Sequence, residues 1–106
     1  MIEEQRVAAR KPLKVKATLS MDGVPPLRGR TLDVSGDGLS VAVEQPFQPG
    51  QQGSVMFDLF LDGVPTRINA RIKVAYCIFS SGEFKIGLSF ANLELASMTA
   101  IAKYMR

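Results

Sequence analysis

Residues 68–90 read INARIKVAYCIFSSGEFKIGLSF and show the repeating pattern that runs through most of this chain. Apolar residues alternate with mostly polar ones on both sides of Ser80-Ser81-Gly82. A period of two is typical of β-strands, whose successive side chains point to opposite faces of a sheet. The serines and the glycine are turn residues. This stretch is therefore predicted to form two antiparallel strands joined by a tight turn.

The same alternation recurs upstream and predicts four more strands. These are residues 13–21, 27–34, 39–43 and 55–61. Asp62-Gly63 is a strong hairpin signal, and Pro25-Pro26 interrupts the pattern between two strands. Short antiparallel strands with tight turns are typical of small barrels, because closing the sheet removes its exposed edges.

Only the C-terminal residues change period. In residues 92–105 apolar side chains recur at helical spacing, with Asn92 as the expected N-cap and Lys103 near the negative end of the helix dipole. The predicted fold is all-β with a terminal helix: a six-stranded antiparallel β-barrel over residues 13–90 and a helix over residues 92–105. That helix is expected to cover a barrel opening or an outer face.

Length and composition indicate one domain, residues 1–106, in the cytoplasm. The chain has 106 residues, 46% hydrophobic and 22% charged, which suits a single hydrophobic core. With no histidine and Cys77 as its only cysteine, we expect no disulfide, metal site or other cofactor. No apolar run reaches the about 18 residues of a membrane helix, and the acidic N-terminus is unlike a signal peptide, so no membrane insertion is expected.

The net charge of +3 is unevenly distributed. Residues 1–30 hold seven Lys/Arg and three Asp/Glu, whereas the remainder holds six and seven. A basic excess favours an anionic ligand, although by charge alone a solvated basic face is the more usual reason for it.

Two short motifs carry the candidate chemistry. Arg6 and Arg10 are spaced R-x-x-x-R before the first strand, and Asp33, Ser35 and Gly38 are spaced D-x-S-x-x-G at the end of the second. Each spacing alone is common, since Asp and Ser often cap turns and paired arginines are often only solvated. No histidine or base–nucleophile pair accompanies them, so no enzyme activity is expected.

Together, in this order on this strand pattern, the motifs resemble the signature of the PilZ family over essentially the whole chain. Residues 86–90, IGLSF, also resemble the family's closing strand. The resemblance implies a six-stranded barrel that binds cyclic di-GMP, a ligand with two guanines and two phosphodiesters. Arg6 and Arg10 would then bind guanine edges and phosphates, for which the planar guanidinium fork is suited. Asp33 would accept from guanine N–H groups, Ser35 would add a hydroxyl contact, and Gly38 would let the backbone turn beneath the ligand.

Two positions depart from the family's common pattern. Gln5 stands where many members have a further arginine, which leaves open whether one or two ligand molecules bind. Asp37 stands in the turn where many members have glycine.

Residues 1–11 are expected to form a flexible arm that cyclic di-GMP orders, passing the signal to an unidentified effector protein. Two alternatives remain: a PilZ-like adaptor that no longer binds the nucleotide, and a small barrel for single-stranded nucleic acid. The second needs exposed aromatic residues for stacking, whereas Phe57, Phe84 and Phe90 fall on expected core positions, and no DNA binding is expected.

Overall fold

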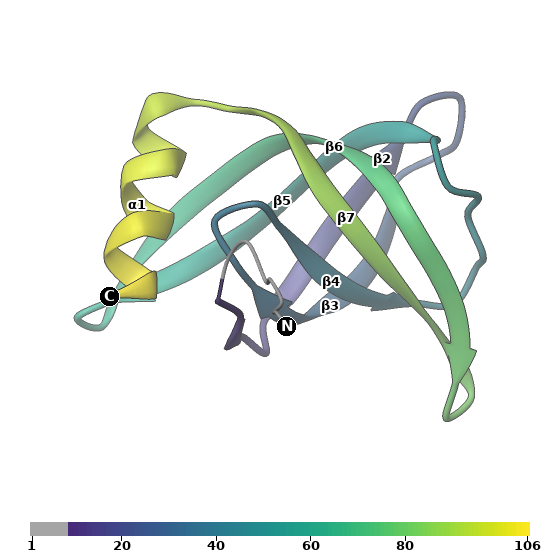
Figure 1. Ribbon diagram of the computed structural model, residues 1–106, viewed down its shortest axis with the longest axis horizontal. Coiled ribbons are helices and arrows are strands. Elements are labelled where there is room, and N and C mark those ends of the chain that lie inside the picture. Colours follow the sequence, from purple (N-terminus) through teal and green to yellow (C-terminus); the bar gives the residue numbers. More distant parts are fainter. Residues whose placement is uncertain (1–8) are drawn as a thin grey trace, which may run out of the picture.

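The computed structural model describes residues 9–106, which form seven strands and one helix (Figure 1). The strands are β1 (Lys11–Pro12), β2 (Lys16–Met21), β3 (Leu27–Val34), β4 (Gly38–Val43), β5 (Gln52–Leu61), β6 (Val64–Ser80) and β7 (Glu83–Leu93), and the helix is α1 (Leu95–Met105).

All pairings are antiparallel and six of the strands close into a barrel. Around the barrel the order is β3, β2, β5, β6, β7 and β4, and β4 pairs back onto β3. The short β1 adds to β3 as an extra strand, with Lys11 opposite Val34 and Pro12 opposite Asp33. The predicted six-stranded antiparallel barrel with a terminal helix is confirmed. Closure gives these strands partners on both sides over most of their length.

The first barrel strand begins later than predicted, because the Thr31 side chain forms hydrogen bonds with the backbone of residues 13–15, which precede that strand. Its buried hydroxyl donates to Leu13 O at 2.5 Å and accepts from the Val15 N–H at 3.0 Å. The Thr31 side chain therefore replaces part of the backbone ladder, beside two backbone hydrogen bonds, from Leu13 N–H to Leu32 O at 3.1 Å and from Thr31 N–H to Val15 O at 2.8 Å. The regular ladder of β2 starts only at Lys16. Leu13 still points inward and is buried.

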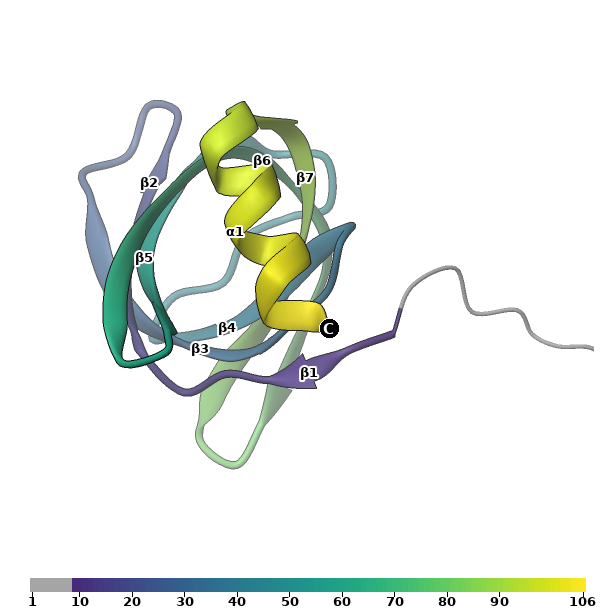
Figure 2. The same ribbon diagram turned by 90° about the vertical axis from the view of Figure 1, so that its left-hand side faces the viewer.

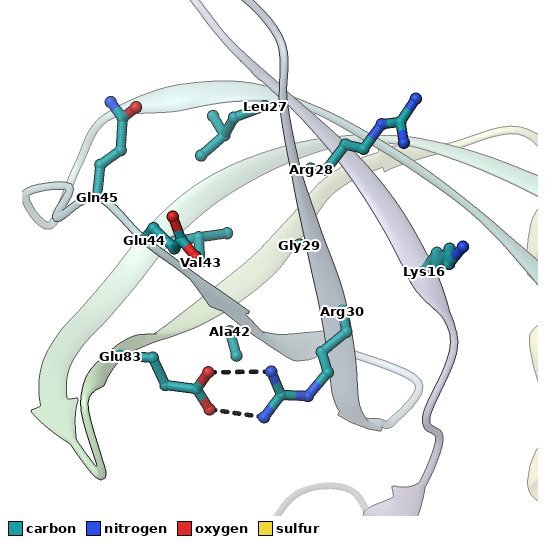
Figure 3. Close-up of a pocket in the computed structure, with 10 residues that line it drawn as sticks. All are labelled: Lys16, Leu27, Arg28, Gly29, Arg30, Ala42, Val43, Glu44, Gln45 and Glu83. Carbon is teal, nitrogen blue, oxygen red and sulfur yellow. Dashed lines mark hydrogen bonds and ion pairs between the residues drawn. The ribbon is translucent and has the colours of Figure 1, made fainter.

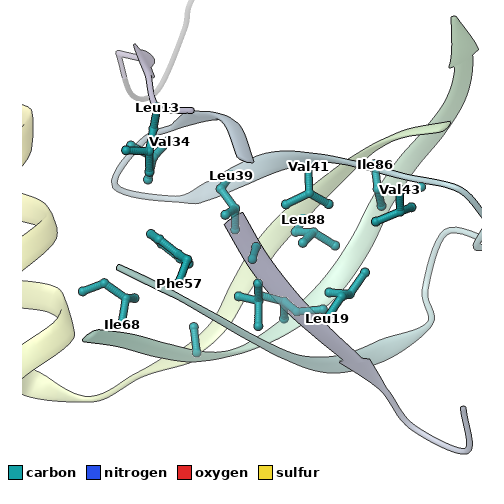
Figure 4. Close-up of a cluster of buried hydrophobic side chains, with 14 of the residues drawn as sticks. Leu13, Leu19, Val34, Leu39, Val41, Val43, Phe57, Ile68, Ile86 and Leu88 are labelled. Atoms are coloured by element: carbon teal, nitrogen blue, oxygen red, sulfur yellow. The ribbon is translucent and has the colours of Figure 1, made fainter. Parts of the chain in front are cut away.

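The core is formed by the inward-facing residues of the alternating pattern (Figure 4). Leu19, Phe57, Ile68 and Ile86 are each at most 2% exposed. Apart from the buried Gly87, the residues on either side of them are partly or fully exposed. Of the aromatics expected in the core, Phe57 is buried as predicted, whereas Phe84 and Phe90 are only partly buried against it.

Helix α1 lies across one end of the barrel and closes it (Figure 2). Its buried residues are Ser97, Ala100 and Ile101, and Lys103 lies in the last turn as expected. No helix in residues 9–106 is long and apolar enough to cross a membrane.

The prediction of Asn92 as the N-cap is wrong. Asn92 lies within β7 opposite Arg71, and the helix starts at Leu95 with Glu94 in the N-cap position. Glu94 makes no side-chain cap; its carbonyl accepts the first helical hydrogen bond from the Met98 N–H at 2.9 Å. Pairing with the long β6 thus extends β7 to Leu93 and overrides the local capping preference of asparagine.

Candidate ligand-binding site

The fold brings the two sequence motifs into contact. Arg10 Nη1 donates to Asp33 Oδ1 at 2.6 Å, although the two residues are 23 positions apart. The pairing of Pro12 with Asp33 holds the chain just after Arg10 against the end of β3. Both side chains stay accessible, with 45% of Arg10 and 33% of Asp33 exposed. Arg6 lies outside the described residues.

Ser35 holds the turn that follows Asp33. It is 2% exposed, its N–H donates to Gly38 O at 2.8 Å, and its hydroxyl lies 3.4 Å from the same oxygen. The hydroxyl also accepts from the Asp37 N–H at 3.2 Å. The Phe90 N–H donates to Asp37 O at 2.9 Å and joins the turn to β7. Ser35 therefore supports the shape of the turn from beneath, and the ligand contact expected of its hydroxyl stays a prediction.

Gly38 is required by the packing of β4 on β7. A Cβ atom at this position would lie 2.0 Å from Leu88 O. The backbone that Gly38 allows to approach is thus that of a neighbouring strand. By contrast, a Cβ at Gly36, on the open side of the turn, would meet nothing within 4 Å.

An apolar groove of about 310 Å³ adjoins the motif residues. It lies between the turn and helix α1, bordered by Ala9, next to Arg10, and by Gly36, next to Ser35. The remaining lining residues are apolar side chains of β7 and α1: Leu93, Met98, Ile101, Ala102 and Met105. A charged rim beside an apolar groove is the usual composition of a small-molecule site.

Helix α1 is fastened to β1 directly beside this site. Lys11 Nζ donates to Tyr104 O at 2.7 Å and lies 4.7 Å from the centre of the Tyr104 ring. The Tyr104 hydroxyl in turn donates to Pro12 O at 2.8 Å. We call these three contacts of Lys11, Pro12 and Tyr104 the β1–α1 clasp. It places Lys11, the last residue of the predicted arm, in the folded structure.

A larger groove of about 770 Å³ lies on the outer face of β3 and β4 and contains none of the motif residues (Figure 3). Arg30 spans it and donates to both carboxylate oxygens of Glu83, at 2.9 and 2.6 Å. These hydrogen bonds lower the pKa of the Glu83 carboxyl and raise that of Arg30. Arg30 is thereby neutralised by Glu83, whereas the other two cations of the groove, Lys16 and Arg28, line it together with Glu44.

The sequence did not predict the groove beside the turn or the β1–α1 clasp. The helical spacing of Met98, Ile101 and Met105 was visible, but it indicated only which residues share a face of α1. Whether that face is wholly covered depends on where the helix lies on the barrel.

Fold and site together describe a small closed β-barrel with an accessible charged turn beside a groove under its terminal helix. The family model for the PilZ domain matches residues 4–106. The chain therefore belongs to the PilZ domain family, as its motifs predicted.

Solved structures share this fold at low sequence identity. The Bacillus subtilis inhibitor of motility, MotI/DgrA, superposes with a TM-score of 0.86 at 16% identity, over 97% of this chain and 50% of that one. The PilZ domain of YcgR from Escherichia coli, solved with c-di-GMP, gives 0.73 at 13% identity, over 96% of this chain and 89% of that one. MrkH of K. pneumonia, in its c-di-GMP complex, gives 0.75 at 14% identity, over 97% and 52%.

The chain thus spans about half the length of MotI/DgrA and of MrkH. A comparison with curated protein sequences gave no significant match.

Proposed function

We propose that this chain is a cyclic di-GMP receptor, not an enzyme, and that the ligand binds at Arg10, Asp33 and the turn beyond them. The observation that carries the proposal is the 2.6 Å contact between Arg10 and Asp33, which joins the family's two motifs into one accessible site. The c-di-GMP complexes of YcgR and MrkH, which share the fold, support the choice of ligand.

The chemistry of the pair suits a guanine nucleotide. Arg10 uses one N–H on Asp33 and keeps others for a guanine O6/N7 edge or a phosphate. Asp33 keeps further lone pairs, which accept from the Watson–Crick N–H groups of guanine. The pair therefore holds both side chains in position before the ligand arrives, which reduces the entropy lost on binding.

The neighbouring groove adds an apolar surface for a base. Leu93, Met98 and Met105 line it within a short reach of the turn. Cyclic di-GMP is larger than this groove, so we propose that one guanine enters it while the phosphodiesters stay at the rim. Ser35 and Gly38 complete the proposed site: Gly38 by letting β4 meet β7, and Ser35 by holding the turn and offering its hydroxyl.

Arg6 is the further proposed contact, and the predicted arm is the proposed signalling element. Ligand binding would order the part of the arm that precedes Ala9 and so create a new surface for a cytoplasmic effector protein. Amide hydrogen exchange of residues 4–8 with and without cyclic di-GMP tests this step. Equal protection in both states would contradict it and leave the receptor proposal intact.

Isothermal titration with cyclic di-GMP, with GTP and cyclic AMP as controls, tests the receptor proposal. The wild-type chain should bind cyclic di-GMP selectively and leave it intact over hours. Arg10→Ala should weaken binding at least tenfold. Arg67→Ala is the matched control, because it removes another accessible arginine, paired with Asp58 at 2.7 Å, from outside the proposed site.

No binding by the wild-type chain would refute the proposal and favour the adaptor alternative. Equal losses in the two arginine variants would refute the site.

A further inference from the structure

One edge of β6 has no partner near its C-terminal end. β5 pairs with β6 as far as Lys73, and the loop before β5 satisfies Val74, whose N–H donates to Gln51 O and whose carbonyl accepts from the Gly50 N–H, both at 2.8 Å. Beyond this point, no other segment of residues 9–106 pairs with that side of β6. Figures 1 and 2 both show the β6–β7 hairpin reaching past the other strands.

The backbone groups on this edge follow from the hairpin geometry. Ser80 and Glu83 flank a two-residue turn, where the flanking pair exchanges hydrogen bonds. The direction of the backbone N–H and C=O groups alternates along a strand. The backbone groups of Ile78 therefore point to β7, like those of Ser80, whereas those of Cys77 and Phe79 point to the unpaired side. We call residues 75–80 of β6 the open edge.

A β-bulge between Val74 and Tyr76 marks the start of the open edge, but the residues after it lack the other features by which proteins usually block strand pairing. Residues 74–80 read VAYCIFS, without charge, proline or glycine and rich in residues that favour strands. Its large side chains are accessible: Tyr76 is 41%, Ile78 53% and Phe79 65% exposed. An uncharged, apolar edge of this kind, although short, is a template for another strand.

We propose that the occupant is a second copy of this chain, paired antiparallel through the same edge. The open edge is compatible with a second copy of itself, because neither strand brings a charge into the contact. A two-fold dimer uses the same surface on both copies, so the assembly is closed and adds no further copies.

The register of this pairing is limited by the hydrogen bonds that Val74 already makes with the loop before β5. A pairing centred on Cys77 would place Ser80 of the partner subunit opposite Val74, where the loop at Gln51 already binds. Moving the centre one residue to Ile78 avoids that loop. Cys77 then pairs with Phe79 of the partner subunit, so that the groups facing the open edge are satisfied in both copies.

The charges nearest the contact are compatible with this pairing. Lys85 lies opposite Ile78 on β7. In the dimer the two copies of Lys85 are separated by three strand spacings, about 14 Å. This exceeds the Debye length of about 8 Å at physiological ionic strength, so their repulsion is largely screened.

Analytical ultracentrifugation of the full chain without nucleotide, at up to about 1 mM, the Kd range of weak protein pairs, tests the proposal independently of ligand binding. We expect a monomer–dimer equilibrium that Ile78→Lys weakens at least tenfold, because it sets two lysines opposite each other. Phe60→Lys is the matched control, since Phe60 is similarly exposed, at 54%, on β5. A chain monomeric throughout, or a dimer indifferent to Ile78→Lys, would overturn the proposal.

Cross-linking tests the register without a destabilising charge. Directly opposed residues of a non-hydrogen-bonded pair have Cα atoms about 4.5 Å apart, within the range of a disulfide. Ile78→Cys in a Cys77→Ser background should therefore form a disulfide dimer under mild oxidation. Phe60→Cys in the same background is the control. Dimerisation of Ile78→Cys no faster than that of Phe60→Cys would exclude this pairing, provided both variants unfold at the wild-type temperature.

Discussion

Asp33 is the residue through which the proposed site distinguishes one nucleotide from another. Asp33→Ala should cost about 1–3 kcal/mol of cyclic di-GMP affinity, because guanine N–H groups lose their acceptor. Since adenine lacks that pair of donors, the variant should lose selectivity between cyclic di-GMP and cyclic di-AMP. Titration of both ligands into wild type and variant measures this. Loss of both affinities to the same extent would mean that Asp33 only positions Arg10.

Gly38 and Gly36 should respond in opposite ways to the same substitution. Gly38→Ala places a methyl group 2.0 Å from Leu88 O, and we expect a loss of at least about 1–3 kcal/mol in the free energy of unfolding. Gly36→Ala meets nothing within 4 Å and should change stability by no more than about 0.5 kcal/mol. Urea denaturation of the two variants measures both changes in the free energy of unfolding. Equal stability of the two would contradict the close approach of β4 and β7.

At the scale of elements, the β1–α1 clasp links the first strand to the C-terminal helix beside the site. Tyr104→Phe removes only the hydroxyl that donates to Pro12 O at 2.8 Å. The bond is exposed, so we expect a loss of about 0.5 kcal/mol, with faster amide exchange at the C-terminal end of α1. Tyr76→Phe is the control, because its hydroxyl lies 3.4 Å from Ser40 and away from the clasp. Unchanged exchange in α1 would show that buried side chains alone hold the helix.

At the scale of the whole molecule, ion pairs between distant segments make stability depend on acid pH. The hydrogen bond from Arg30 lowers the pKa of Glu83 below its usual 4.5, and that from Arg71 lowers the pKa of Asp22 below its usual 3.8. A lowered pKa in the folded state means a stabilising contribution that is complete above the usual value and is lost as pH falls through the folded value. The unfolding temperature should therefore decrease below about pH 4.5.

Glu83→Gln should make this acid dependence shallower, and Arg30→Gln should do the same by removing the cause of the shift. Thermal unfolding between pH 3 and pH 7 measures both slopes. Both pairs are solvent-exposed, so we expect small effects that decrease with added salt. If the unfolding temperature of Arg30→Gln depends on pH as steeply as that of wild type, the Arg30–Glu83 ion pair does not cause the acid dependence.

The strands and the motifs were predictable from the sequence because their signals are local. Residues 68–90 form the two predicted strands, since a period of two is required wherever one face of a strand is buried. The PilZ assignment depended on residue types at fixed spacing, which need no tertiary information. Asn92 shows the limit of such signals: its capping preference was real, but pairing with Arg71 across the sheet outweighed it.

The tertiary structure alone decided which distant residues meet. Nothing in the spacing indicated that Lys11 and Pro12 would pair with β3 and bring Arg10 to Asp33, or that Thr31 would replace a stretch of the ladder. The groove beside the turn and the open edge of β6 likewise depend on where α1 lies and where β5 ends. Periodicity specifies which face of a strand or helix is buried. The groove and the open edge depend instead on which other element covers that face or edge, and closure of the barrel determines this.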